Sequence, residues 1–188
     1  TFTVRLDSQF ANGKYTGSAP VTTFISDLQN VTMKKELPSL FNDASYTWNG
    51  NSYNLSFRCS NSMDLLTFVM PGLYIDAGTS ITASLSDKGI FKAGIQSNRL
   101  AFGKNYLKGL EATFGNADER LGGNLECDEM RLASAYINDN TLNLHADDDH
   151  IGVKFSYDNH SELLNMGEFI LNGALSREDE SPVLDLNV

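Results

Sequence analysis

The feature that most constrains this chain is an alternation of apolar and polar residues with a period of two. Tyr53, Leu55 and Phe57 alternate with polar neighbours. The same alternation recurs in four later segments: Ile81/Ala83/Leu85, Leu110/Ala112/Phe114, Leu142/Leu144/Ala146 and Ile151/Val153/Phe155/Tyr157. Because successive side chains of a β-strand point to opposite faces, each segment predicts a strand with one apolar and one polar face. One-sided strands are typical of antiparallel sheets, whereas parallel strands read as continuous apolar runs.

Turn-forming residues separate these strands. They cluster at residues 49–51, 87–89, 103–105, 116–118, 138–140 and 158–160, where Gly, Asn and Asp tolerate positive φ. From residue 87 onward the clusters recur every 10 to 20 residues or so, the rhythm of successive hairpins. No helical period lies between the strands, which argues against βαβ units. The chain is therefore predicted to be all-β, with one long antiparallel sheet.

Two segments interrupt the strand pattern. Residues 60–72 begin with cap-type residues, carry Asp64 in the first turn and end in Pro71-Gly72, which predicts one short helix. Residues 31–41 stay unassigned, because Pro38 would interrupt either a helix or a central strand.

The predicted sheet can bury its apolar face in two ways. Roughly ten to twelve strands at ~4.8 Å spacing give a sheet on the order of 50 Å wide, which must twist or curl. It can fold into a sandwich whose two apolar faces fill each other. It can also curl part-way into an open trough. The alternation is the same in both, so both alternatives stay open.

Composition narrows the classes of partner. The 188 residues hold 14 Lys and Arg against 24 Asp and Glu, a formal net charge of −10. This balance argues against a nucleic-acid-binding protein, which needs a basic stripe, and against docking on anionic lipid headgroups by overall charge. Hydrophobic residues make up 41%, enough for a buried core.

The two ends of the chain read as strands. Residues 1–6 and 184–188 alternate, and no Met opens the sequence. We therefore expect residues 1–188 to be a single all-β segment of a larger chain, cut within a domain. Cys59 and Cys127 could pair in an oxidising compartment, but two buried, unpaired thiols are the favoured interpretation.

No catalytic or cofactor-binding motif is found, so neither an enzyme nor a bound cofactor is predicted. The best metal candidate is the run 145–150, with His145, three aspartates and His150, together with His160. The run lacks the Gly and distal Glu of a calcium loop, which favours a solvated acidic hairpin tip and no metal site.

The apolar faces of the strands have two interpretations. Their aromatic residues could form an ordinary core, or they could line a trough that accepts acyl chains. The candidate lining residues are Leu55, Phe57, Ile81, Leu85, Leu110, Phe114, Leu144, Val153, Phe155 and Phe169.

Several segments resemble the TamB-type proteins, the translocation-and-assembly-module (AsmA-like) family of Gram-negative bacteria. The resemblance lies in the runs 68–81, with its Pro-Gly-Leu element, 90–103, 106–110 (Tyr-Leu-Lys-Gly-Leu) and 152–159, which ends in an aromatic-Asp-Asn turn. It covers roughly residues 45–175.

The resemblance implies a curled sheet, folded like a taco, with an apolar groove. It further implies a periplasmic protein that is anchored to the inner membrane through another part of the chain. Such a protein would carry phospholipid between the inner and outer membranes and work with a barrel-type outer-membrane assembly protein. Two alternatives remain: a scaffold that offers sheet edges to outer-membrane proteins by strand addition, and a self-contained β-sandwich binding module.

Overall fold

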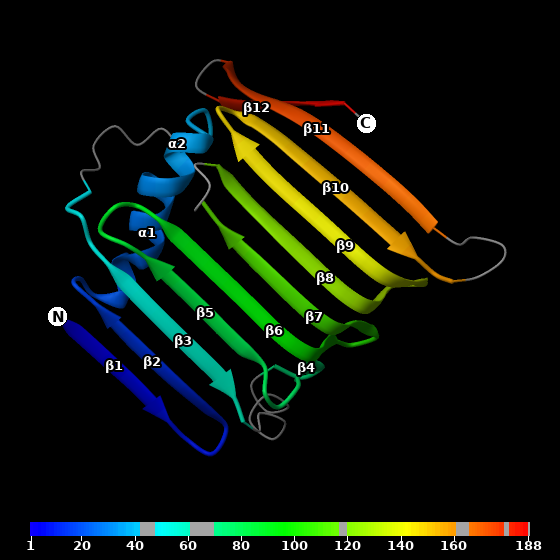
Figure 1. Cartoon of the computed structure of the whole chain (residues 1–188), viewed down its shortest axis with the longest axis horizontal. Coiled ribbons are helices and arrows are strands. Elements are labelled where there is room, and N and C mark those ends of the chain that lie inside the picture. Colours follow the sequence, from blue (N-terminus) through cyan, green and yellow to red (C-terminus); the bar gives the residue numbers. More distant parts are fainter. Residues whose placement is uncertain (42–47, 61–69, 117–119, 161–165, 179–180, 188) are drawn as a thin grey trace.

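The computed structural model describes residues 1–41, 48–60, 70–116, 120–160, 166–178 and 181–187. Over these residues one antiparallel sheet of twelve strands dominates (Figure 1). Its strands are β1 (Phe2–Asp7), β2 (Ala11–Gly17), β3 (Tyr53–Cys59), β4 (Leu73–Ile75), β5 (Ser80–Leu85), β6 (Phe91–Phe102), β7 (Asn105–Gly115), β8 (Leu121–Leu132), β9 (Ala135–Asp147), β10 (His150–Asp158), β11 (Met166–Glu178) and β12 (Ser181–Asn187).

The strands follow one another across the sheet in chain order, except that β4 pairs with one end of β6, off the main path. This confirms the predicted all-β class and the long antiparallel sheet. Among the described strands the sheet stays open, with β1 at one edge and β12 at the other, so they do not form the two facing layers of a sandwich. The sandwich alternative is therefore wrong.

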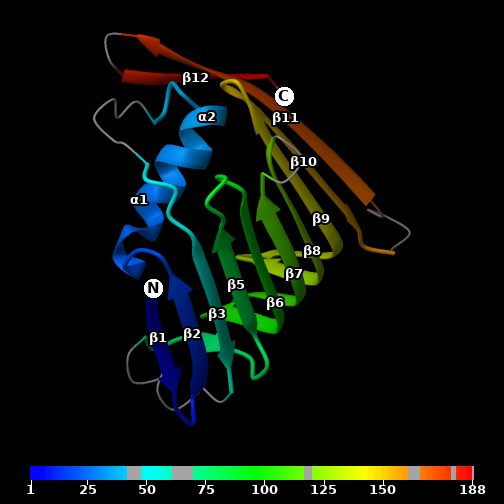
Figure 2. The same cartoon turned by 60° about the vertical axis from the view of Figure 1, so that its left-hand side comes forward.

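A helical segment, residues 21–36, connects β2 to β3 across one face of the sheet (Figures 1 and 2). It consists of η1 (Val21–Thr23), α1 (Phe24–Leu28), the π-helical turn η2 (Gln29–Met33) and α2 (Lys34–Glu36). Phe24 and Leu28, four residues apart, pack against the sheet, as one face of a helix does. The predicted helix at residues 60–72 lies almost entirely outside the described residues.

The core lies between this helical segment and one end of the strands. Leu28 packs with Tyr15, Tyr53, Leu85 and Phe91. A second cluster continues it toward β11 and consists of Leu37, Leu121, Ala146 and Leu175. One end of the sheet's apolar face is thus covered.

At the opposite end, strands β6 to β9 bend in one row, formed by Asn98, Gly109, Asp128 and Asp139. The regular pairing is interrupted at this row and resumes beyond it in the same register. Gly109 has φ 62° and Asp139 has φ 43°, left-handed values that turn the chain. Beyond the bend, the strand ends and β4 form a short sheet, here called the floor, and the main sheet is called the wall (Figure 2).

The bend also exchanges the apolar face of each strand. In all four strands an apolar wall residue is matched by an apolar floor residue five positions away across the bend: Ile95 and Leu100, Ala112 and Leu107, Leu125 and Met130, Leu142 and Ile137. In a flat strand an odd step places two side chains on opposite faces. Here Ile95 and Leu100 line one pocket. The floor therefore turns its apolar face toward the wall.

The structure corrects one predicted turn. Residues 138–140 lie within β9, and the chain reverses at Ala133-Ser134 instead. The positive φ that Asp139 adopts serves the bend row rather than a hairpin. The predicted turns at Gly89 and Gly103 are confirmed, with φ values of 77° and 59°.

Candidate functional site

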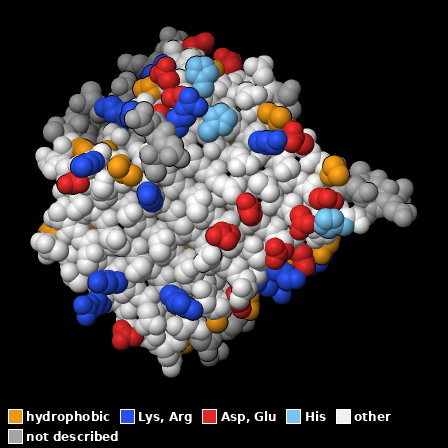
Figure 3. All heavy atoms as spheres, viewed as in Figure 1, with side chains coloured by type: hydrophobic (Ala, Val, Ile, Leu, Met, Phe, Trp, Pro, Cys, Tyr) orange, Lys and Arg blue, Asp and Glu red, His pale blue; other side chains and the backbone are white. Residues whose placement is uncertain are grey.

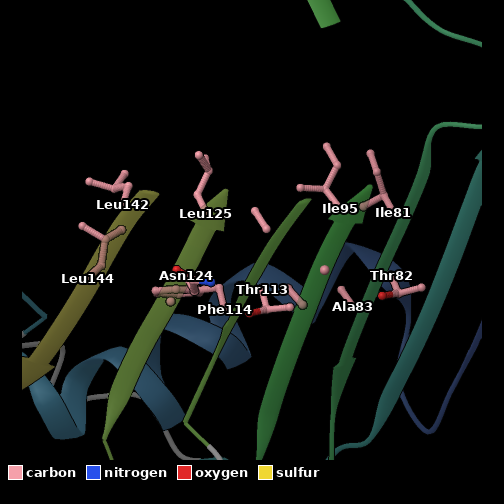
Figure 4. A pocket seen from close by; sticks show the side chains of 14 residues that line it. Ile81, Thr82, Ala83, Ile95, Thr113, Phe114, Asn124, Leu125, Leu142 and Leu144 are labelled. Carbon is pink, nitrogen blue, oxygen red and sulfur yellow. The ribbon is translucent and has the colours of Figure 1, made fainter. Parts of the chain in front are cut away.

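The candidate site is an apolar trough between the helical segment and the floor. Its wall part is a pocket of about 330 Å³, within the range of small-molecule sites. Figure 4 shows Ile81, Ile95, Leu125 and Leu142 side by side on neighbouring strands. Register places these four side chains in one row across β5, β6, β8 and β9.

Small residues deepen the pocket. Ala83, Ala93, Ala112 and Gly123 lie on the same face as Ile95, on four consecutive strands. Their short side chains leave a depression between the larger residues around them. Phe114 borders it and stacks edge-on against the buried Phe91, at 5.9 Å between ring centroids. A flexible hydrocarbon chain fits such a surface, which offers mainly dispersion contacts.

The floor contributes a second pocket of about 390 Å³. It is lined by Leu73, Ile75, Leu100 and Leu107 from the floor and by Phe57 from the wall, among others. Ile81 and Ile95 line both pockets. The two pockets therefore form one continuous trough.

The covered end of the trough is held by a buried carboxylate. Asp27 of α1 is 1% exposed. Its Oδ2 accepts hydrogen bonds from Asn51 Nδ2 at 2.9 Å and from the Tyr53 hydroxyl. Burial, together with the hydrogen bond to Asp27, raises the pKa of Tyr53 to about 12. A buried carboxylate without partners would be costly, so these donors fix the helical segment on the sheet.

The structure places the ten predicted lining residues on one face of the sheet but in different surroundings. Leu85 and Leu110 are only 1% and 5% exposed. Leu85 belongs to the core under the helical segment, and Leu110 lies in the inner corner just before the bend, so neither offers a surface to a ligand. The others are half-buried or exposed on the trough face: Leu55, Phe57, Ile81, Phe114, Leu144, Val153, Phe155 and Phe169.

Several trough residues were not among the predicted ones. Ile95, Leu125 and Leu142 follow the same alternation, so the periodicity of their strands was the available signal. Leu100 and Leu107 could not be assigned by alternation alone, because the bend reverses it.

The opposite face of the sheet is polar. Figure 3 shows charged and histidine side chains scattered over it, with hydrophobic side chains mainly near its margins. Arg58, Glu111, Glu126, Asn143 and Lys154 belong to this face by register. The sheet thus has one apolar face, which forms the trough, and one polar face, which is exposed to solvent.

The predicted acidic hairpin tip is confirmed. Asp148 and Asp149 form the turn between β9 and β10, with φ values of 45° and 62°. Asp149 receives hydrogen bonds from Ser39 N and Oγ at 2.9 and 2.8 Å, so it ties the chain after α2 to the sheet. Within the described ranges no group of three potential ligands is placed to hold a metal ion.

Cys59 and Cys127 are both buried and free. Burial raises the pKa of the Cys127 thiol. The favoured interpretation of two unpaired, buried thiols is confirmed.

The chain has no match among protein-family models, curated proteins or solved structures. Among the described helices, none is both long and apolar enough to cross a membrane.

Proposed function

We propose that the trough binds the acyl chains of phospholipids and forms one segment of a conduit along which they move. The observation that carries this proposal is the open apolar surface, which runs without a polar interruption from Ile81 on β5 to Leu142 on β9. The polar outer face and the absence of any catalytic motif in the sequence agree with a passive surface.

The energetics favour such a surface. Each methylene that leaves water for an apolar environment gains ~0.8 kcal/mol. A lipid with about thirty chain carbons would face on the order of 25 kcal/mol in crossing open water, as an upper bound from the same figure. A trough that covers the chains while the headgroup stays wet removes most of that barrier. Contacts spread over many strands bind weakly at each point and so allow movement.

The resemblance to TamB-type proteins extends the proposal to a biological setting. In this setting the chain is part of a periplasmic bridge, anchored to the inner membrane through another part of the protein. It moves phospholipid between the membranes and supports outer-membrane biogenesis together with a barrel-type assembly protein. The support is the curled one-sided sheet, which is the architecture that the resemblance implies.

The test is native mass spectrometry of the purified chain, with lipid extraction to identify the cargo. Phe114→Asp and Phe155→Asp each place a charge on the trough face and should lower bound lipid at least about tenfold, because a buried charge is strongly disfavoured there. Asn143→Asp is the matched control, since it adds the same charge on the outer face of β9. Equal lipid content in all variants would overturn the proposal.

A second candidate function is the strand-edge scaffold. The observation that favours it is the edge strand β1, on which Phe2, Val4 and Leu6 are 46%, 55% and 49% exposed. An exposed apolar edge is a template for strand addition. Photo-crosslinkers at Thr3 and Arg5 should then capture outer-membrane proteins, whereas lipid conduction requires no such adducts.

A further inference from the structure

Two neighbouring hairpin tips at the end of the floor combine exposed apolar residues with basic ones. The first tip joins β6 to β7 and the second joins β8 to β9. Phe102, Leu132 and Tyr136 are 57%, 53% and 51% exposed, among the most exposed large apolar residues of the described chain. Isolated exposed apolar residues are ordinary, but a cluster on adjacent tips marks an interaction site.

The two tips are held together. Asn105 Oδ1 accepts a hydrogen bond of 2.7 Å from the Ala133 amide, and Tyr106 pairs with Arg131 in the sheet. The Gly103 amide in turn donates to the Gly72 carbonyl at 2.9 Å, which fixes the first tip to the turn before β4. These contacts make the tips one continuous surface, here called the lip.

The charge of the lip is opposite to that of the whole chain. Residues 99–108 and 129–137 contain four cations, Arg99, Lys104, Lys108 and Arg131, and one carboxylate, Glu129, although the chain has a net charge of −10. Lys108 pairs with Glu129 at 2.6 Å. Lys104 and Arg131, both exposed, belong to none of the ion pairs found among the described residues.

The outer face of the floor, next to the lip, also carries aromatic and basic side chains. Tyr74, Tyr106 and Tyr136 lie in one row across it, together with Arg131. The Arg99 guanidinium lies over the Tyr74 and Tyr106 rings, at 5.7 and 5.0 Å from their centroids. Tyrosine and basic side chains beside apolar ones are the composition of surfaces that rest in the headgroup region of a bilayer.

The lip also borders the trough. Phe102, Leu132 and Asn105 themselves line the floor pocket. An apolar surface that continues from a tip into a pocket gives an acyl chain an unbroken path between a bilayer and the trough.

We infer that this lip docks on the surface of an anionic phospholipid bilayer, with Lys104 and Arg131 at the headgroups and Phe102 and Leu132 below them. The lip is then the entrance through which lipid passes into or out of the trough. Its use as an entrance rests on the proposed function, whereas the docking does not.

The test is flotation of the purified chain with vesicles of phosphatidylcholine and phosphatidylglycerol, or of phosphatidylcholine alone. The wild-type chain should float with the mixed vesicles and less with the neutral ones. The pair K104E/R131E should lower partitioning to mixed vesicles at least about tenfold, since each basic residue near an anionic surface contributes about fivefold. The pair F102S/L132S should lower partitioning to both kinds of vesicle.

The matched control is K14E/R58E, which makes the same change of charge at exposed sites on the outer face of β2 and β3. It should float like the wild type, and circular dichroism should show the same sheet content in every variant. If the control loses as much partitioning as K104E/R131E, or if the wild-type chain does not float, the inference is wrong.

A last variant separates this inference from the proposed function. Phe155→Asp lies on β10, away from the tips, and should float normally while its bound lipid falls at least about tenfold. If the chain floats through its lip but never carries lipid, docking stands and conduction fails. If it carries lipid without floating, conduction stands and docking fails.

Discussion

The covered end and the open middle of the trough face differ in exposure although they lie on the same strands. Leu85 and Ile81 both belong to β5 and point to the same face, yet Leu85 is 1% exposed and Ile81 is 38% exposed. On β6 the contrast recurs between the buried Phe91 and the half-buried Ile95. The strand sequence does not distinguish the two regions. The helical segment distinguishes them, because it covers one and leaves the other open.

The comparison shows where stability and binding are separated in this molecule. Residues under the helical segment make the contacts that hold the fold together, whereas the open residues retain apolar surface for a ligand. An open apolar surface contributes less to folding, because part of it stays in water. Apolar residues on one face of the sheet therefore have two roles: those under the helical segment stabilise the fold, and the open ones can bind a ligand.

The sharpest test of this separation is a pair of truncations on one strand. Leu85→Ala should lower the free energy of unfolding by about 3 kcal/mol, because it leaves a cavity in the core. Ile81→Ala should cost only about 1 kcal/mol, because its side chain is already partly exposed. Urea denaturation followed by circular dichroism measures both. Equal losses would mean that the two regions do not differ as described.

A second prediction concerns the contact that keeps the cover in place. Tyr53→Phe removes a hydrogen bond to the buried Asp27 and should cost about 2 kcal/mol. Tyr74→Phe is the control, since Tyr74 also donates to an aspartate, Asp76 at 2.9 Å, but in a less buried place. Its loss should be smaller. Thermal melts of the two variants decide between these outcomes.

A third prediction concerns the bend that closes the trough opposite the cover. Gly109→Ala puts a Cβ at a residue with φ 62° and against the Asp128 carboxylate. The left-handed conformation alone costs an ordinary residue about 1–2 kcal/mol. Gly103→Ala also has a positive φ, of 59°, but its Cβ would meet open space, so it should lose less stability. A larger loss at Gly103 would contradict the role of Gly109 in the bend.

A fourth prediction concerns alkaline pH. The pKa of Tyr53 is about 12 in the folded chain, above its ordinary value of 10.0. Its contribution to stability is therefore complete below pH 10 and is lost as the pH rises through 12. Among the seven tyrosines, the phenolate absorbance of Tyr53 should develop late, and Tyr53→Phe should remove that late component. Absence of a late component in the wild-type chain would contradict the buried contact.

Much of the wall could be predicted from the sequence, because alternation directly reports one-sided strands. The segments around Phe57, Phe114 and Phe155 form strands as expected. The helical segment at residues 21–36 was missed, because Pro38 is compatible with neither a helix nor a central strand and left residues 31–41 unassigned, while Phe24 and Leu28 show a helical spacing. That spacing of four was the available signal.

The open state of the trough and the floor could not be predicted in the same way. Whether Leu85 or Ile81 is covered depends on a segment that lies far from both in the sequence. The floor depends on local backbone conformation at Gly109 and Asp139, which alternation does not report. Reading β6 as one regular strand places Leu100 on the wrong side of the sheet.

The five-residue step across the bend has a consequence for how this chain can change length. Adding or deleting one residue between Ile95 and Leu100 would turn the apolar face of the floor part of β6 away from the trough. That part of β6 would then no longer match β7, β8 and β9. An insertion of two residues in one strand would keep the facing but shift its pairing with the adjacent strands, so these strands can lengthen across the bend only when all four change together. Insertions and deletions should accumulate instead at the hairpin tips and in the outer strands, where a change of length does not alter which face of the bent strands is apolar.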